Sequence, residues 1–196
     1  MPASGITSIA LLAAFVFLGY LNPFFDGLNL SIRRWVNRTR VSALRPLMIL
    51  THRFNDVLSV SIQLLALGLF IGFIFKDWYR ATLLTSTLLV QTAIVGVAKR
   101  MTAVDRPPQA AAYVIMTSGS YPSGHSSISL SFALLVPTIL NPFLPLAAIW
   151  LMGGYLMISA ILTAYGRLYL DVHWLSDIIG GWLLAVATYL AVRLLL

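Results

Sequence analysis

Long apolar runs dominate the pattern along the chain and alternate with short polar connections. A helix needs roughly 20 apolar residues to cross the hydrocarbon core of a bilayer, so each long run predicts a membrane span. Six runs fit this description: Ile6–Leu21, Val57–Phe75, Ala81–Ala98, Ser126–Leu140, Leu144–Tyr165 and Ile178–Leu196. The pattern therefore predicts an all-α fold, a six-span transmembrane helical bundle forming a single domain over residues 1–196, with both termini on one side.

The connection between the first two runs, residues 26–56, is too polar to cross a membrane. Apolar residues recur in it at roughly helical spacing: Leu28, Ile32, Trp35 and Val36. This pattern is typical of an amphipathic helix that lies in the membrane interface. Its arginines would then reach lipid phosphates: Arg33, Arg34, Arg38 and Arg40. A positively charged topology loop explains the same residues equally well, and both interpretations stay open.

The composition supports lipid as the surrounding medium. Of 196 residues, 59% are hydrophobic and 10% are charged, whereas soluble domains carry about 25% charged residues. The net charge of +7 suits anionic lipid head groups or a phosphate-bearing substrate, although basic loops alone also produce such a charge. We expect membrane lipids and a lipid phosphate as partners, and no nucleic acid. Because the chain has no Cys, disulfides and thiolate chemistry are excluded.

Residues that can carry chemistry gather where the third and fifth runs end and where the fourth and sixth begin. In chain order they are Lys99 and Arg106, then Ser123, Gly124 and His125, then Arg167, His173 and Asp177. Consecutive spans alternate in direction, so these four ends lie at the same face of the membrane. Residues far apart in the sequence can therefore meet there.

Such a cluster suits the binding of a phosphate and the transfer of its phosphoryl group. Three cations neutralise a group with several negative oxygens, and guanidinium groups match phosphate with paired hydrogen bonds. Gly124 at a helix start lets backbone N–H groups approach an anion closely. Histidines supply nucleophilicity and proton transfer near neutral pH. Asp177 lies four residues after His173, on the same helical face, where it can accept the ring N–H.

A metal site is the competing interpretation. Two His and one Asp can bind Zn²⁺. However, three cations in the same cluster would repel the ion, and the chain contains no Glu to build a carboxylate cage. We therefore expect metal-independent chemistry with no cofactor.

Taken together, the motifs resemble a known three-part signature. The order is Lys99 and Arg106-Pro107, then Pro122-Ser123-Gly124-His125, then Arg167, His173 and Asp177. It resembles the signature of the type 2 phosphatidic acid phosphatase (PAP2) superfamily. The resemblance implies that His173 attacks phosphorus to form a phosphohistidine, that Asp177 orients it and that His125 is the general acid. It also implies a set of phosphate-binding residues: Lys99, Arg106, Ser123, Gly124 and Arg167.

The resemblance also implies a function. It indicates a bacterial integral-membrane lipid phosphatase, and we favour undecaprenyl diphosphate as its substrate. A lipid phosphotransferase and a non-catalytic lipid carrier or flippase are the alternatives. Membrane enzymes of the family generally work on the periplasmic, extracellular or lumenal side, whereas the positive-inside rule places this basic face in the cytoplasm. We follow the resemblance and expect a protein of the bacterial cytoplasmic (inner) membrane whose active site faces outward. The family pattern usually has Ser before the third-motif Arg, where this chain has Gly166, so one phosphate hydrogen bond is expected to be missing.

Polar residues outside the motifs are interpreted as structural. His52 is expected to be an interfacial side chain. Gln63 and Gln91, inside the second and third runs, are expected to form hydrogen bonds between helices. Asp105 and Asp171 flank the cluster and are expected to be solvated loop carboxylates.

Overall fold

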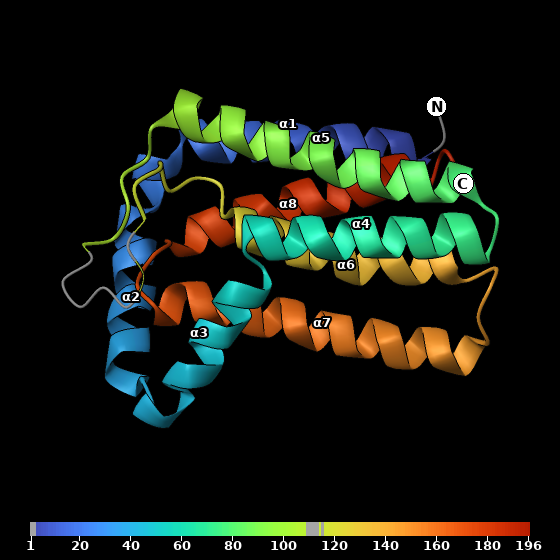
Figure 1. Ribbon diagram of the computed structural model, residues 1–196. Helices are drawn as coiled ribbons and strands as arrows, with labels where there is room; N and C mark the ends of the chain where they lie inside the picture. Colours follow the sequence, from blue (N-terminus) through green and yellow to red (C-terminus); the bar gives the residue numbers. More distant parts are fainter. Residues whose placement is uncertain (1–2, 109–113, 115) are drawn as a thin grey trace.

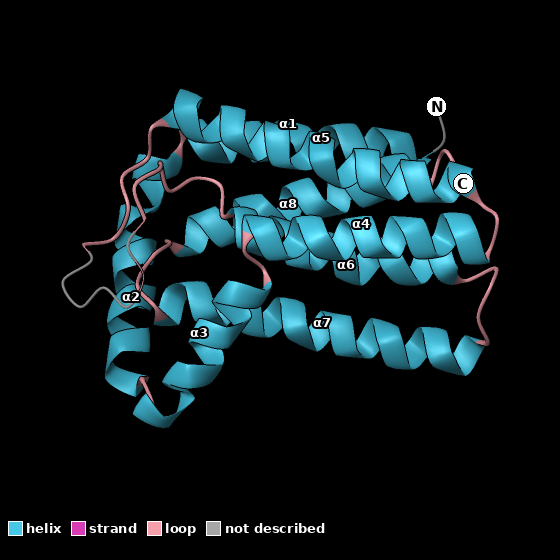
Figure 2. Ribbon diagram, in the orientation of Figure 1, coloured by secondary structure: helices cyan, strands magenta, loops and turns pink. Residues whose placement is uncertain are grey.

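The computed structural model describes residues 3–108, 114 and 116–196. These residues form α-helices, loops and two short 3₁₀ helices, Asn22–Phe25 and Ser42–Leu44, with no strand among them (Figures 1 and 2). The α-helices are α1 Ala3–Tyr20, α2 Asp26–Thr39, α3 Arg45–Phe54, α4 Val57–Ile74, α5 Trp78–Thr102, α6 Gly124–Leu140, α7 Leu146–Tyr169 and α8 Leu175–Val192. The predicted all-α fold is confirmed.

The long helices lie lengthwise in one bundle, and α2 and α3 lie at one end of it (Figure 1). Helix α1 packs against α8, α4 packs against α5, and α6 packs against both α7 and α8. Each predicted apolar run forms one of the long helices, with bounds that differ by a few residues. Both chain ends lie at the end of the bundle opposite α2 and α3, as the alternation of runs predicts (Figure 1).

Fewer helices are long enough to cross a membrane than the six apolar runs predict. Among the described residues, four helices are long and apolar enough to cross a membrane, namely α1, α5, α7 and α8. A fifth is obtained if the segments Ser42–Phe54 and Leu58–Ile74, which meet at 57°, form one bent span. Helix α6 is apolar but has only 17 residues. The structure thus supports four to five spans by length and composition, and six remains a prediction.

A polar contact inside the bundle joins α5 to α6. The Gln91 side chain donates to Ser127 Oγ at 2.6 Å and accepts from Ser131 Oγ at 2.8 Å. This confirms the interhelical interpretation of Gln91, a type of contact that contributes about 0.6 kcal/mol in membrane proteins. Gln63 instead donates to the carbonyl oxygen of Phe54 at 2.9 Å and so joins α4 to α3.

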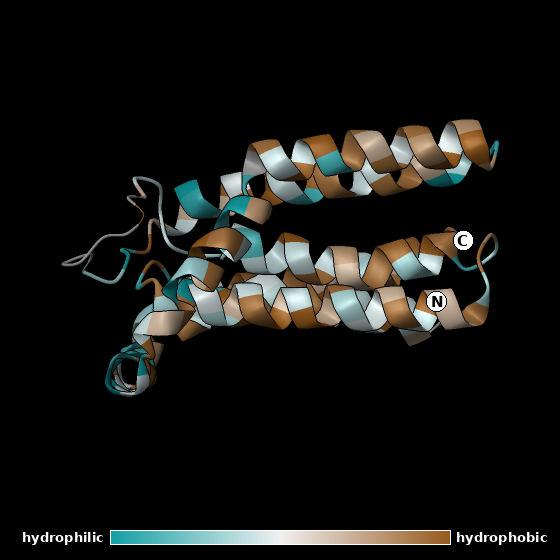
Figure 3. Ribbon diagram, turned by 60° about the horizontal axis from the view of Figure 1, so that its bottom comes forward, coloured by the Kyte–Doolittle hydropathy of each residue, from teal (hydrophilic) through white to brown (hydrophobic). Residues whose placement is uncertain are grey.

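The basic stretch after α1 forms two helices, α2 and α3, separated by a short turn. Hydrophilic residues gather at α2 and the nearby loops, while the bundle is largely hydrophobic (Figure 3). The apolar residues of α2 do not share one environment, because Val36 is fully buried whereas Trp35 is 57% exposed. Arg33 forms an ion pair with Asp171 at 2.7 Å, so Asp171 is not the freely solvated carboxylate that was expected. The interfacial position of α2 stays a prediction.

Tyr121 anchors the loop before α6 to two other helices. Its hydroxyl donates to the Phe15 carbonyl oxygen of α1 at 2.5 Å. Its ring lies over two glycines: a Cβ atom on Gly180 of α8 would lie 2.3 Å from Tyr121 Cε2, and one on Gly19 of α1 would lie 2.8 Å from Cε1. Side chains at these two positions are therefore incompatible with the position of Tyr121.

We predict that Gly180→Ala lowers the free energy of unfolding by about 1–3 kcal/mol, because the added methyl group forces Tyr121 out of its place. Thermal unfolding of the detergent-solubilised protein measures the change. Gly154→Ala in α7 is the matched control, since nothing lies within 4 Å of the added Cβ. Equal melting temperatures for the two variants would contradict the assigned packing.

Candidate active site

The three motifs meet at the end of the bundle that carries α2 and α3. The last turns of α5 and α7, the first turns of α6 and α8, and the connecting loops lie there (Figure 1). A cavity of about 170 Å³ opens among them. Its lining includes Lys99, Arg106, Gly124, His125 and His173. The predicted meeting of distant motifs at one face is therefore observed in the fold.

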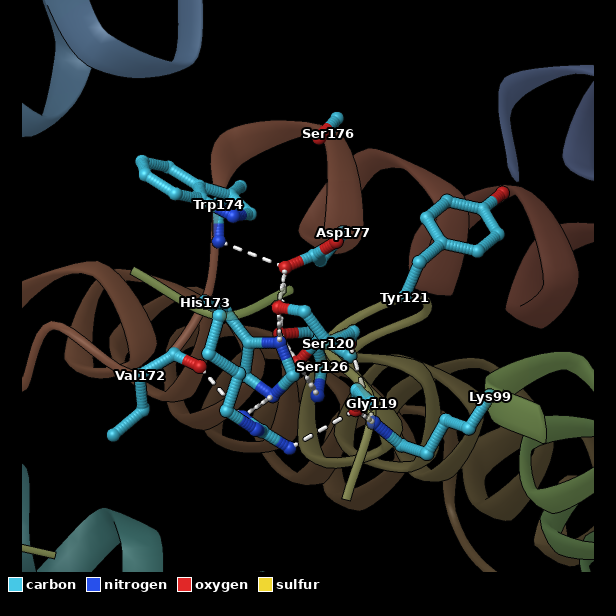
Figure 4. A network of polar contacts seen from close by, with 12 residues as sticks. Lys99, Gly119, Ser120, Tyr121, Ser126, Val172, His173, Trp174, Ser176 and Asp177 are labelled. Atoms are coloured by element: carbon cyan, nitrogen blue, oxygen red, sulfur yellow. Dashed lines mark hydrogen bonds and ion pairs between the residues drawn. The ribbon is translucent and has the colours of Figure 1, made fainter. Parts of the chain in front are cut away.

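His173 and Asp177 form a buried pair at the start of α8 (Figure 4). Nδ1 of His173 lies 3.1 Å from Asp177 Oδ2, and the two residues are 3% and 0% exposed. A carboxylate only accepts hydrogen bonds, so the imidazole proton of this contact lies on Nδ1. The lone pair of Nε2 is then directed away from Asp177.

The helix start explains why these two residues meet. Asp177 is the third residue of α8, and its Oδ2 atom accepts the backbone N–H of Trp174 at 2.8 Å. This contact satisfies one of the free N–H groups of a helix N-terminus, where a negative charge is also favourable. The cap therefore positions His173, which immediately precedes Trp174, beside the carboxylate.

Ser120 is a further partner of this pair. Its hydroxyl donates to Asp177 Oδ2 and lies 3.4 Å from His173 Nδ1. The Ser120 side chain is fully buried. Its backbone N–H donates to the carbonyl oxygen of Val104 at 2.7 Å. This bond holds the end of the α5–α6 connection against its beginning.

Arg106 contacts the other side of the His173 ring. Its Nη1 atom lies 3.3 Å from His173 Nε2 and donates to the carbonyl oxygen of Val172 at 2.5 Å. Its Nε atom donates to the carbonyl oxygen of Ser118 at 2.8 Å. A guanidinium group only donates, so the contact with Nε2 agrees with a lone pair on that atom.

Lys99 reaches the same loop from α5 (Figure 4). Its Nζ atom donates to the carbonyl oxygens of Gly119 at 2.6 Å and Ser120 at 3.2 Å. Gly119 has no room for a side chain, because an added Cβ would lie 2.8 Å from the Lys99 carbonyl oxygen. The close approach holds the ammonium group at the cavity.

The electrostatics of the site keep His173 neutral. Burial holds the pKa of His173 well below its usual value of 6.5, and the positive charges of Arg167, Arg106 and Lys99 act in the same direction. Burial also lowers the pKa of Arg106, while the charge of Asp177 opposes this change. A neutral imidazole retains the lone pair that a nucleophile needs. Three cations that act on one ring also favour a bound anion.

Arg167 and His125 carry unused hydrogen-bonding capacity. Arg167 is 1% exposed, and its Nε and Nη2 atoms are buried without a hydrogen-bond partner among the described residues. The Nε2 atom of His125 is in the same situation. An unsatisfied buried donor or acceptor costs about 1–3 kcal/mol, so such groups commonly mark a functional site.

Ser123 and Gly124 begin α6. The Ser123 side chain accepts the N–H of Ser126 at 3.4 Å and lies 2.9 Å from the Ser126 hydroxyl, so it caps the helix. Gly124 lines the cavity at the first position of the helix, and a Cβ there would lie 3.3 Å from Val95 Cγ1. The backbone N–H groups of Gly124 and His125, the first two residues of the helix, have no partner within it and suit an anion.

Two neighbours of the site were missed by the sequence analysis. Ser120 lies in a loop with no periodicity that could indicate its partner. His52 was expected to be an interfacial side chain, yet its Nδ1 atom lies 2.5 Å from Arg167 Nη1 and its ring stacks on that of His125. The only sequence signal for His52 is a titratable ring in a basic segment. Gly166 lies inside α7, where none of the described glycines has a positive φ.

In the described part of the chain, no three His, Cys, Asp or Glu side chains are grouped as a metal ion requires.

Comparisons with known proteins agree with this architecture. A solved structure of a transmembrane PAP2 type phosphatidylglycerolphosphate phosphatase from Bacillus subtilis superimposes with a TM-score of 0.85 at 20% identity, covering 96% of this chain and 95% of that one. LpxE from Aquifex aeolicus superimposes with a TM-score of 0.65 at 19% identity, covering 85% of this chain and 94% of that one. At these identities the likeness shows a shared fold.

Relatives found by sequence comparison are also named as lipid phosphatases. An undecaprenyl-diphosphatase from Sulfolobus acidocaldarius is 30% identical over 164 residues, which cover 81% of this chain and 73% of the relative. The putative undecaprenyl-diphosphatase YbjG from Escherichia coli is 34% identical over 76 residues, 39% of this chain and 34% of the relative. The model of the PAP2 superfamily matches residues 80–196, which include every motif residue. The chain therefore belongs to the PAP2 superfamily of membrane lipid phosphatases.

Proposed function

We propose that the protein is a metal-independent phosphatase that hydrolyses undecaprenyl diphosphate, or a closely related lipid phosphate, through a phosphohistidine. One observation carries the proposal. His173 is neutral, is held by Asp177 and lies with Lys99, Arg106 and His125 at one cavity. The proposed nucleophile, general acid and phosphate-binding cations thus lie in one place.

In the first step, the lone pair of His173 Nε2 attacks phosphorus and forms an N–P bond. The bond from phosphorus to the leaving lipid oxygen breaks, and His125 gives that oxygen a proton, which the ring takes up when the negative charge of the bound phosphate group favours its protonated form. Asp177 stabilises the positive charge that develops on the His173 ring. Its geometry supports this role, because Ser120 and the Trp174 N–H hold the carboxylate in place.

In the second step, water attacks the phosphohistidine. His125 accepts a proton from the water, the N–P bond breaks and its electron pair returns to His173 Nε2, releasing inorganic phosphate. The Arg106 donor that lies near Nε2, the Lys99 ammonium group and the free Arg167 donors would hold the phosphate oxygens in both steps. Preorganised donors of this kind stabilise the charge of the transition state.

Two features support a long-chain lipid diphosphate as substrate. The matched sequence relatives are named as an undecaprenyl-diphosphatase and a putative one. In addition, an apolar groove of about 410 Å³ runs along α1 and α5, and its lining includes Phe15, Val97, Met101 and Tyr121. Tyr121 immediately precedes the Pro122-Ser123-Gly124-His125 motif. A lipid whose tail lies in this groove would have its head group near the cavity.

We predict that purified protein releases phosphate from undecaprenyl diphosphate faster than from phosphatidate, phosphatidylglycerol phosphate or lipid A. His173→Ala should abolish release, since no nucleophile remains, and His125→Ala should reduce it by about 10²–10⁴-fold. Phosphate release on this lipid panel is the measurement. Full activity of His173→Ala would refute the phosphohistidine. Transfer of the phosphoryl group to a second lipid would indicate a phosphotransferase, and binding without turnover would indicate a carrier.

We predict that phosphate release is unchanged by EDTA and is inhibited by vanadate, which adopts the trigonal bipyramidal geometry of the phosphoryl-transfer transition state. The cluster of three cations supports this expectation because it can stabilise an oxyanion without a metal. The rate in buffer with and without chelator is the measurement. Activity that is lost in chelator and restored by Zn²⁺ or Mg²⁺ would require a different mechanism.

We propose further that the active site faces away from the cytoplasm of the bacterial inner membrane. Charge argues for the opposite orientation. Of the 13 Lys and Arg residues, only Lys76, Arg80 and Arg193 belong to the α4–α5 connection, the first turn of α5 or the end of α8, which lie at the far end of the bundle (Figure 1). However, several residues at the site end are engaged within the protein, such as Lys99, Arg106 and Arg33. The outward orientation is supported by the PAP2 family, whose membrane enzymes generally work on the periplasmic, extracellular or lumenal side.

The absence of Cys makes the orientation measurable. We predict that Thr117→Cys, at the site end, reacts with a membrane-impermeant thiol reagent in intact cells, and that Asn141→Cys, at the opposite end, does not. Both positions are exposed. Labelling of both variants after lysis controls for accessibility, and the reverse pattern in intact cells would place the site in the cytoplasm.

A further inference from the structure

We infer that His52, on α3, is a positioning residue of this active site that holds both Arg167 and His125. The inference rests on the proposed function and adds to it a third histidine outside the three motifs. His52 belongs to a helix that lies outside residues 80–196, the part matched by the family model.

The first contact is with Arg167. Nδ1 of His52 lies 2.5 Å from Arg167 Nη1. Because the guanidinium group can only donate, Nδ1 must be the acceptor, and His52 is neutral in this arrangement with its proton on Nε2. The contact occupies one end of the guanidinium group and leaves Nε and Nη2, which are buried and have no partner among the described residues. Those two atoms form one side of the fork that matches two phosphate oxygens.

The second contact is with His125. The two imidazole rings stack with their centroids 4.7 Å apart and their planes at 22°. Nε2 of His125 is buried without a partner within the described chain, so no hydrogen bond to that atom fixes the ring. The flat face of His52 thus limits the orientations of the proposed general acid. A displacement of about 1 Å at such a group can cost about 10²-fold in rate.

The packing of α3 on α7 makes both contacts available. A Cβ atom on Gly166 would lie 3.2 Å from Thr51 Oγ1 and 3.4 Å from Met48 Sδ, both on α3. The missing side chain at this position therefore lets α3 approach α7 closely, one residue before Arg167. The missing phosphate hydrogen bond at Gly166 stays a prediction, and the same glycine also brings His52 to the guanidinium group.

Substitutions of His52 can separate the two contacts. In His52→Asn, the side-chain oxygen replaces Nδ1 as acceptor for Arg167, while the ring that contacts His125 is lost. In His52→Phe, a ring remains against His125, while the acceptor is lost. His52→Ala removes both. Arg53→Gln, at the exposed neighbouring position on α3, is the matched control.

The experiment measures kcat and KM for phosphate release from undecaprenyl diphosphate, together with vanadate binding, which is read as the rise in melting temperature. We expect His52→Ala to lose about 10²-fold in kcat/KM. His52→Asn should keep the vanadate affinity and KM but lower kcat. His52→Phe should weaken vanadate binding and raise KM about tenfold. Arg53→Gln should behave as the wild type.

Several results would overturn the inference. One is that the Asn and Phe variants keep the kcat, the KM and the vanadate binding of the wild type. Another is that both variants lose all three parameters equally and that these losses scale with a lowered melting temperature. If His52→Ala does not fold, these two variants still decide. Vanadate binding does not require turnover. A wild-type protein that binds vanadate but releases no phosphate would therefore refute the proposed function, while the Arg167 contact could still be tested.

Discussion

The buried carboxylate of Asp177 holds three separate stretches of the chain in one place. Its Oδ2 atom accepts from Ser120 in the loop before α6, from His173 after α7 and from the backbone N–H at the start of α8. A buried charge is tolerated only when it is hydrogen-bonded or paired. The three partners therefore stabilise the carboxylate, and in return the carboxylate determines where the two loops and the helix meet. The position of His173 follows from this arrangement.

The cations around this carboxylate repel one another. The charges of Lys99, Arg106 and Arg167 all disfavour a positive charge on His173. The negative charge of Asp177 favours the positive charge of Arg106. Like charges at close range destabilise a fold, and free buried donors on Arg167 add to the cost. A phosphate would relieve both effects at once. A functional site commonly lowers the stability of the fold in this way, because the groups that bind a substrate are unfavourable without it.

The helices could be predicted from the sequence because apolar length is a local property. The helix ends depend on capping contacts, which are harder to predict from the sequence. Helix α8 begins at Leu175 and not at Ile178, because the Asp177 side chain accepts the backbone N–H of Trp174, the residue before the helix. The meeting of the eight predicted site residues could be predicted from the alternating direction of the spans alone. Ser120 and His52 could not, because their positions depend on tertiary contacts, namely the Ser120 bond to Val104 and the approach of α3 to α7 across Gly166.

The anchoring of Tyr121 has a consequence for how the chain is divided. Every motif residue lies within residues 80–196, yet the loop that carries the second motif is attached to the carbonyl oxygen of Phe15, and its tyrosine ring rests against Gly19. Helix α1 thus supports the loop that carries the second motif, although it contributes no motif residue. The segment that carries the family signature is therefore held in place by contacts outside it, so a change at Phe15 or Gly19 can displace a motif that lies about 100 residues further along the chain.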